Sequence, residues 1–195
     1  MRDVDRAVSP PLLTATADTL RRLGPRQFSL TAVAEHAGVS RGTIHNALGS
    51  RDNAIRIGLD HLASAFIETI AAEADRHGTL ADQVAAAAVV ICAHRRQSDS
   101  VAPRGINESI LVLLLRNTGD DLMRRSIDLW KPFVQAARER GEVGSGVAPA
   151  RGSEWIVRLL LSFELLPPIG VNLDSARAVK RFVSDHIVVG LTGRQ

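Results

Sequence analysis

The stretch SLTAVAEHAGVSRGTIHNALGSRD, residues 29–52, has the start and stop signals of short helices joined by tight turns. Ser29, Ser40 and Ser50 each precede a helix-like segment, and serine is preferred at a helix N-cap because its hydroxyl accepts a hydrogen bond from a free backbone N–H. Gly38 and Gly49 follow two of these segments, and glycine commonly ends a helix because it adopts left-handed backbone without a steric penalty. The stretch therefore predicts three successive helices, over residues 30–36, 41–48 and 50–77.

The rest of the chain has the same helical periodicity and few signals for strands. Apolar residues recur at three- and four-residue intervals, Tyr is absent, and Gly and Pro lie between the segments. The further predicted helices cover residues 10–23, 80–97, 106–116, 120–140, 151–166 and 174–189. We predict an all-α fold of about nine helices. Residues 1–50 would form a three-helix domain that contains a helix-turn-helix, joined through the long fourth helix to a second helical domain, residues 51–195.

Positive charge is concentrated near the N-terminus. The whole chain has a formal net charge of +3, but residues 20–56 contain six Arg against two acidic residues, a local charge of +4. The other 158 residues contain 18 Lys and Arg against 19 acidic residues, or −1. A basic segment on an otherwise near-neutral protein is typical of a polyanion-binding surface. Surface charge without a partner is the alternative interpretation.

Composition argues against several other classes of protein. The single Cys92 excludes an intramolecular disulfide and a Cys-rich zinc site, and it favours a reducing cytoplasm. We expect no signal peptide and no membrane association, because the N-terminal segment lacks an apolar core and the apolar runs, such as residues 110–115, are too short to span a bilayer. No H-E-x-x-H, Gly-rich phosphate loop or G-x-S-x-G occurs, so we expect neither enzymatic activity nor a metal or cofactor.

The helix predicted over residues 41–48 divides into a buried and an exposed side. Val39, Ile44 and Leu48 are predicted to face inward. The residues predicted to lie outside are Arg41, Gly42, Thr43, His45 and Asn46, with Ala47 at the margin. Arg can bind guanine and Asn adenine with two hydrogen bonds each, and a Thr methyl can contact a thymine methyl. The exposed side therefore suits a DNA groove, although a helix-turn-helix can also be a purely structural corner.

The run SLTAVAEHAGVSRGTIHNALGSRDNAI, residues 29–55, resembles the DNA-binding signature of the TetR family of bacterial repressors. The shared positions are Ser29, Val33-Ala34, Ala37-Gly38-Val39-Ser40, Gly42-Thr43-Ile44, and Ser50-Arg51 before Asp52 and Ile55. The resemblance implies contacts to double-stranded DNA from Thr31, Arg41, Gly42, Thr43, His45, Asn46, Ala47 and Arg51. The free N–H groups at Ser40 and Ser50, at the starts of two helices, suit phosphates. Arg51 stands where the family usually has a phosphate-binding Lys. His45 replaces the usual Tyr and Leu48 the usual aromatic residue, which leaves the operator sequence open.

The N-terminal Arg2 and Arg6 could reach a minor groove as an arm, or they could remain solvated.

The resemblance also implies a cavity for a small-molecule effector among the helices of residues 80–140. Its candidate lining residues are His94, Asn107, Glu108, Leu111, Trp130 and Phe133. A few polar groups in an apolar cavity would orient a ligand. Glu108 could equally lie exposed in the first turn of its helix. Aromatic residues make up only 4% of the chain, which favours an elongated aliphatic effector over a flat one.

The last two predicted helices carry apolar stripes that suit a dimer interface. One stripe consists of Trp155, Leu159, Phe163 and Leu166, and the other of Val179, Phe182, Val183 and His186. Two such helices from each subunit would form a four-helix interface around a two-fold axis. Burial of both stripes within one chain is the alternative. We favour the homodimer because a single short recognition helix reads too few bases, whereas two helices read a palindrome.

The sequence thus predicts a cytoplasmic DNA-binding regulator, a repressor that binds a palindromic operator as a homodimer and is released by a small apolar molecule. An activator, or a helical protein-interaction module that keeps the fold without ligand-induced release, is the alternative.

Overall fold

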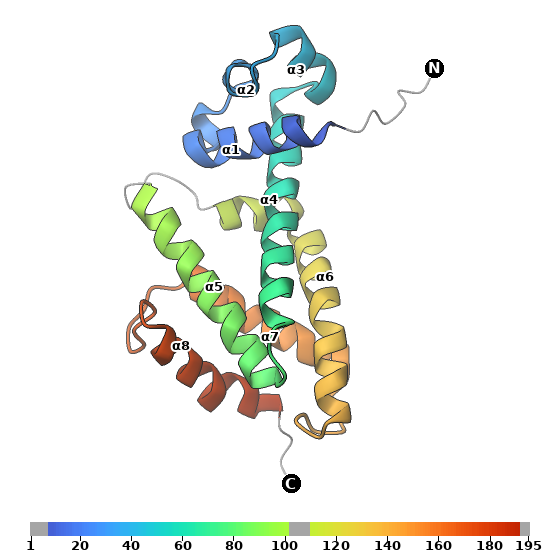
Figure 1. Ribbon diagram of the computed structural model, residues 1–195, viewed down its shortest axis with the longest axis vertical. Helices are drawn as coiled ribbons and strands as arrows, with labels where there is room; N and C mark the ends of the chain where they lie inside the picture. The colour runs from blue at the N-terminus through green and yellow to red at the C-terminus, as the bar shows by residue number, and fades with distance from the viewer. Residues whose placement is uncertain (1–7, 102–109, 192–195) are drawn as a thin grey trace. The chain divides into compact units, whose positions relative to one another are not determined.

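The computed structural model describes residues 8–101 and 110–191, and all regular secondary structure in these ranges is helical (Figure 1). The all-α prediction is confirmed. The α-helices are α1 (Pro10–Gln27), α2 (Leu30–Ala37), α3 (Arg41–Leu48), α4 (Arg51–Ala74), α5 (Leu80–Val101), α6 (Ile110–Glu139), α7 (Pro149–Leu165) and α8 (Ala176–Phe182). A π-helical segment, Val183–Val188, and a 3-10 turn, Val189–Leu191, continue from α8. None of the helices in these ranges is long and apolar enough to cross a membrane.

The element α6 contains a kink at Thr118. Two helical stretches of the described residues, 110–117 and 119–139, meet there, which agrees with the separate segments predicted over residues 106–116 and 120–140, and Thr118 itself has non-helical φ −142° and ψ 27°. The Thr118 hydroxyl donates a hydrogen bond to the carbonyl oxygen of Leu114 at 3.1 Å. This bond back to the preceding turn lies at the residue where the helical geometry is interrupted.

The chain divides into two compact units. Unit 1 comprises residues 1–66 and 105–118, and unit 2 comprises residues 67–104 and 119–195. The division falls within α4, between Phe66 and Ile67, and within α6, between Thr118 and Gly119.

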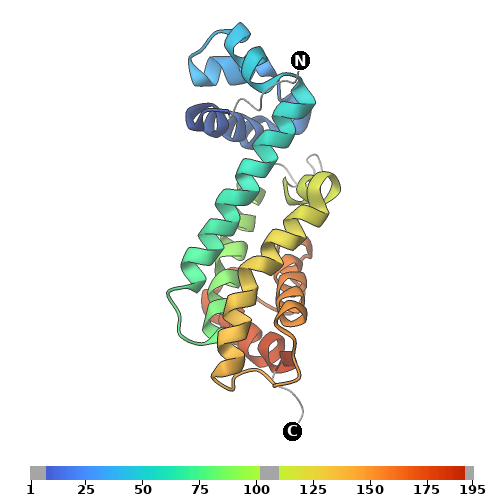
Figure 2. The same cartoon turned by 90° about the vertical axis from the view of Figure 1, so that its right-hand side faces the viewer.

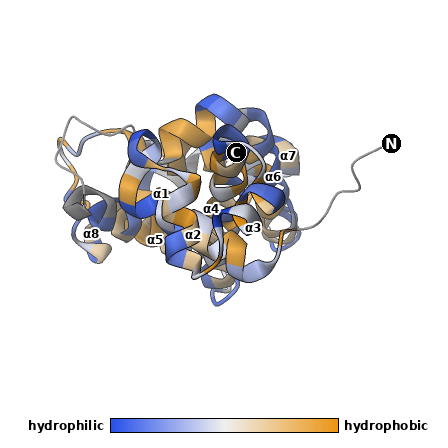
Figure 3. Ribbon diagram, turned by 90° about the horizontal axis from the view of Figure 1, so that it is seen from above, coloured by the Kyte–Doolittle hydropathy of each residue, from blue (hydrophilic) through white to orange (hydrophobic). Residues whose placement is uncertain are grey.

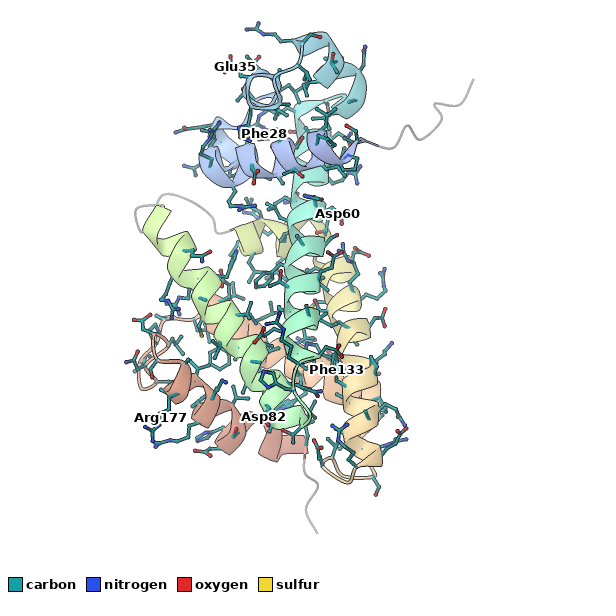
Figure 4. All side chains as sticks on the ribbon, viewed as in Figure 1. Phe28, Glu35, Asp60, Asp82, Phe133 and Arg177 are labelled. Carbon is teal, nitrogen blue, oxygen red and sulfur yellow. The ribbon has the colours of Figure 1, made fainter. Side chains whose placement is uncertain are left out.

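Unit 1 contains α1, α2, α3, residues 51–66 of α4 and residues 110–118 of α6. Its buried core includes Leu20, Phe28, Val33, Ile44 and Leu48, each at most 2% exposed. Figure 4 labels Phe28, which lies where the chain passes from α1 to α2. The helices are amphipathic, and apolar and polar segments alternate along α1 in Figure 3. Burial of one face of each short helix, more than its intrinsic propensity, therefore stabilises this part of the fold.

Glycine allows α4 to approach α1 closely. A Cβ atom added at Gly58 would lie 3.3 Å from both the Leu20 Cδ2 and the Thr16 Cγ2 atoms. Such distances are tighter than ordinary van der Waals contact, so a larger residue at this position would require the Leu20 and Thr16 side chains to shift.

Unit 2 packs α7 and α8 against α5 (Figures 1 and 2). The first half of α5 contains a run of four buried alanines, residues 85–88, whose small side chains let neighbouring helices come close. Ile156, Leu160 and Phe163 of α7 and Val179 of α8 are buried as well. The first free backbone N–H of α5, at Leu80, donates to the Glu142 carboxylate at 2.8 Å. Glu142 thereby acts as a cap supplied from a distant part of the chain.

Candidate functional site

The turn between α2 and α3 has the geometry that its sequence predicts. Gly38 adopts left-handed backbone, with φ 66° and ψ 31°, and its N–H bonds to the carbonyl oxygens of Ala34 and Glu35. The hydroxyl of Ser29 accepts from the Ala32 N–H at 3.1 Å and that of Ser40 from the Thr43 N–H at 3.0 Å. Both ends of the turn are therefore fixed by local hydrogen bonds, which hold α3 in a defined orientation on α2.

Helix α3 has one buried and one exposed side. Ile44 and Leu48 are fully buried, as predicted. Arg41, Gly42, Thr43, His45 and Asn46 are exposed, and Ala47 is partly buried. The prediction that Val39 faces inward is wrong, because its residue is 36% exposed. Val39 lies in the turn before α3, so the helical periodicity of α3 does not set its direction.

The other predicted contact residues of this region lie beside that exposed side. Thr31, in the first turn of α2, is partly exposed. The Ser40 hydroxyl caps α3 and lies 2.9 Å from the Thr43 hydroxyl, so these two side chains are preorganised by each other. Glu35, labelled in Figure 4, places an acidic side chain at the exposed surface of α2. Arg41, His45 and Asn46 are the exposed long polar side chains of α3.

Arg51 makes internal contacts that the sequence did not predict. Its Nε donates to the Phe28 carbonyl oxygen at 2.9 Å, and its Nη2 donates to the carbonyl oxygen of Pro25. Its Nη1 lies 3.6 Å from an Asp52 carboxylate oxygen. The α1 backbone is interrupted at Gly24, with φ 69°, so nearby carbonyls lack full helical partners. The guanidinium satisfies two of them and ties the start of α4 to the α1–α2 connection.

Asn53 is a second contributor that sequence reasoning missed. Its side-chain amide donates to the Leu48 carbonyl oxygen at 2.8 Å, at the C-terminal end of α3. Its backbone N–H bonds to the Ser50 hydroxyl at 3.2 Å, and its side-chain oxygen accepts from Arg56 at 2.9 Å. Asn53 therefore couples the end of α3 to the first turn of α4.

The candidate effector residues are distributed over the chain. In unit 2, the Trp130 and Phe133 rings of α6 lie 5.5 Å apart between centroids, and His94 lies on α5. Trp130 is buried, and Phe133, labelled in Figure 4, is partly buried. Leu111 belongs to unit 1. Asn107 and Glu108 lie outside the described residues, as do Arg2 and Arg6.

The two apolar stripes of the last helices are divided between core and surface. Phe163, Val179 and Val183 are buried within the chain itself, so for these three side chains the intrachain interpretation applies. Phe163 packs edge-on against Phe182, which stacks on His186 with 4.7 Å between ring centroids. Trp155 and Leu166 remain 44% and 61% exposed, Leu159 and Phe182 are partly exposed, and His186 is exposed.

No family model and no curated protein sequence matches this chain. Its fold, however, matches solved structures over nearly the full length of both chains. The TetR family transcriptional regulator CifR, complexed with 26 bp double-strand operator DNA, superposes with a TM-score of 0.62 at 16% identity, covering 94% of this chain and 99% of that chain. The chain has the fold of TetR-family transcriptional regulators.

Two further TetR-like structures extend the comparison. The TetR family repressor AlkX from Dietzia sp. strain DQ12-45-1b, implicated in biodegradation of n-alkanes, gives a TM-score of 0.58 at 19% identity, with coverage of 95% and 98%. The transcriptional regulator FadR from Bacillus subtilis, in complex with stearoyl-CoA, gives 0.60 at 14% identity, with coverage of 91% and 98%. The similarity therefore includes both units of the TetR-like fold.

Proposed function

We propose that this protein is a TetR-like transcriptional regulator that reads double-stranded DNA with α3. The observation that supports this most strongly is the exposed side of α3, where Arg41, His45 and Asn46 lie on a helix that is capped at its start and anchored by two buried residues. A rigid short helix with polar side chains on one face suits the major groove. An interaction module would not need an uncompensated cationic side chain at this position.

The roles of the residues follow from their chemistry. Arg41 would grip guanine through two hydrogen bonds, Asn46 would do the same with adenine, and the methyl group of Thr43 would contact a thymine methyl. Gly42 would let the backbone approach the DNA, and Ala47 would contact the groove at its margin. Thr31, Ser40 and His45 would contact the sugar-phosphate backbone, and these contacts fix the register without reading the sequence.

A homodimer would present two copies of α3 to a palindromic operator. The exposed part of the apolar stripes, formed by Trp155, Leu159, Leu166, Phe182 and His186, supports such an interface. Trp is enriched at the centres of interfaces, where it contributes a large apolar area.

Control by a small molecule completes the proposal. A ligand in unit 2 would release the protein from its operator if it binds better to a conformation in which the two copies of α3 are wrongly spaced. The TetR-like structures that carry stearoyl-CoA or relate to n-alkane degradation support an effector with an aliphatic part. We place this regulator in the cytoplasm, as a repressor.

The proposed function is tested by selecting bound sequences from a pool of random duplexes at two salt concentrations. We expect enrichment of a palindrome whose half-sites are about one or more helical turns apart, with weaker binding at higher salt. Binding without any enrichment would show that the basic segment is merely electrostatic and would favour an interaction module instead.

A further inference from the structure

Glu164, near the C-terminal end of α7, has a carboxylate that is buried but incompletely bonded. Its side chain is only 8% exposed. One oxygen, Oε1, lies 3.6 Å from Nδ1 of His94 on α5. The other oxygen, Oε2, is fully buried and has no hydrogen-bond partner among the described residues. Since an ionised carboxylate accepts several hydrogen bonds, this group retains unused acceptor capacity inside unit 2.

Such an arrangement is unusual for a purely structural pair. The distance of 3.6 Å to His94 is longer than a hydrogen bond, so the imidazole does not satisfy Oε1 directly. A buried carboxyl oxygen without a partner is costly, and most buried polar atoms in native proteins are bonded. The unused acceptor therefore calls for a donor from outside the described chain.

The neighbouring cations are directed at backbone carbonyl groups. Arg95 Nη1 donates to the carbonyl oxygens of Phe163 and Leu166, at 3.3 and 2.9 Å. Arg96 Nη1 donates to those of Leu173 and Asp174, at 3.5 and 3.4 Å, and lies 3.9 Å from the Asp174 carboxylate. These bonds hold the connection between α7 and α8 against α5, and they fix the helix end that carries Glu164.

The Glu164 carboxylate lies near a buried thiol on α5. Cys92, on the same helix as His94, is buried, and burial raises the pKa of its thiol. The charges of Arg95 and Arg96 lower that pKa, whereas those of Glu164 and Asp174 raise it, so the Glu164 carboxylate lies close enough to act on α5. The His94 side chain, by contrast, is 40% exposed and connects the pair to solvent.

We infer that Glu164 and His94 bind the polar end of the effector, and that this end is a hydrogen-bond donor, a hydroxyl or an amine, on an otherwise aliphatic molecule. A donor would satisfy Oε2 with a charge-assisted hydrogen bond. A carboxylate or phosphate end would bring a second acceptor-only anion against Glu164 and be repelled. The inference rests on the proposed control by a ligand and adds the chemical class of that ligand.

The test compares three probes of equal chain length, 1-octanol, octylamine and octanoate, by isothermal titration calorimetry with the full chain. We expect the affinity of the wild-type protein for 1-octanol and octylamine to be at least about tenfold higher than for octanoate, because only these two probes supply a hydrogen-bond donor. Glu164→Gln should remove this preference, since the amide presents its own N–H donors as well as an acceptor. Glu154→Gln is the matched control, because Glu154 lies on the same helix but pairs with Arg158 at the surface, and it should keep the preference.

The second variant, His94→Ala, removes the partly exposed partner of Glu164. It should weaken the binding of octylamine and 1-octanol and leave the binding of octanoate unchanged. Three results would overturn the inference: octanoate binds as tightly as the other probes, none of the three probes binds, or the preference survives in Glu164→Gln or His94→Ala.

Operator binding is measured on the same preparations without probes. Wild-type protein that binds a selected operator but shows no donor preference refutes only the inference. Protein that binds octylamine through Glu164 but enriches no operator refutes the proposed DNA-binding function and leaves the donor site standing.

Discussion

Replacement of Arg51 by Lys separates an internal structural role from a role in binding phosphate. Lys keeps the positive charge but cannot reproduce the planar fork that donates to Phe28 and Pro25. A net hydrogen bond contributes about 0.5–1.5 kcal/mol to stability, and the side chain is 45% exposed, which reduces the benefit of its charge. We therefore expect Arg51→Lys to lower the free energy of unfolding by about 1–2 kcal/mol for the two bonds together.

Urea unfolding followed by circular dichroism measures that loss, and fluorescence anisotropy over a salt series measures DNA binding. The slope of log K against log salt reflects the number of phosphates that the protein neutralises. If Arg51 contacts a phosphate through its charge alone, this slope should be the same for Arg51→Lys as for the wild type. Arg22→Lys is the matched control, because Arg22 is an exposed arginine of α1, and its stability should not change. A stability of Arg51→Lys equal to that of the wild type would refute the bridging role that we assign to the guanidinium.

Three further predictions concern the turn, the dimer and a helix cap. Gly38→Ala should lower the free energy of unfolding by about 1 kcal/mol, measured in urea, because Gly38 has φ 66°; an unchanged midpoint would contradict the turn geometry. If the proposed dimer forms through these stripes, Trp155→Arg combined with Leu166→Glu should convert it into a monomer in sedimentation velocity and weaken operator binding, whereas a dimer that persists in this variant would place the interface elsewhere. The hydrogen bond from Arg140 lowers the pKa of Glu142, helped by the N–H of Leu80, while partial burial opposes this. The stability from this carboxylate should therefore be present above its ordinary pKa of 4.5 and be lost as pH falls below it; Glu142→Gln should lose that part of the acid dependence, and identical pH profiles would disprove the assignment.

Local signals predicted the parts of the fold that local bonds determine. Ser29, Ser40 and Gly38 each act within three or four residues, so the helix-turn-helix could be predicted from its sequence. The periodicity of α3 likewise predicted that Ile44 and Leu48 are buried. The same periodicity predicts the wrong direction for Val39, because Val39 lies before the first residue of α3 and helical geometry does not apply to it.

Contacts between distant residues could not be predicted in the same way. Arg51 bonds to carbonyl groups 23 and 26 residues away, and nothing in its immediate sequence marks them. The choice of Arg where Lys is usual in the TetR family was the one available signal. Glu164 faces His94 across 70 residues, and the burial of Phe163 and Val179 depends on how α5 packs against them. An apolar stripe predicts that a surface will be covered, but it does not say whether the same chain or a partner covers it.

The most direct test of the account is the base preference of Arg41→Ala on a selected operator. Arg41 is exposed at the first position of α3, so it should read one base pair in each half-site. We expect the variant to lose discrimination at that base pair by about 1–3 kcal/mol, measured by anisotropy with every single-base substitution of the operator, and to keep it elsewhere. An equal loss of affinity for all sequences, including random DNA, would show that Arg41 contacts only phosphate and would contradict the claim that α3 reads the sequence.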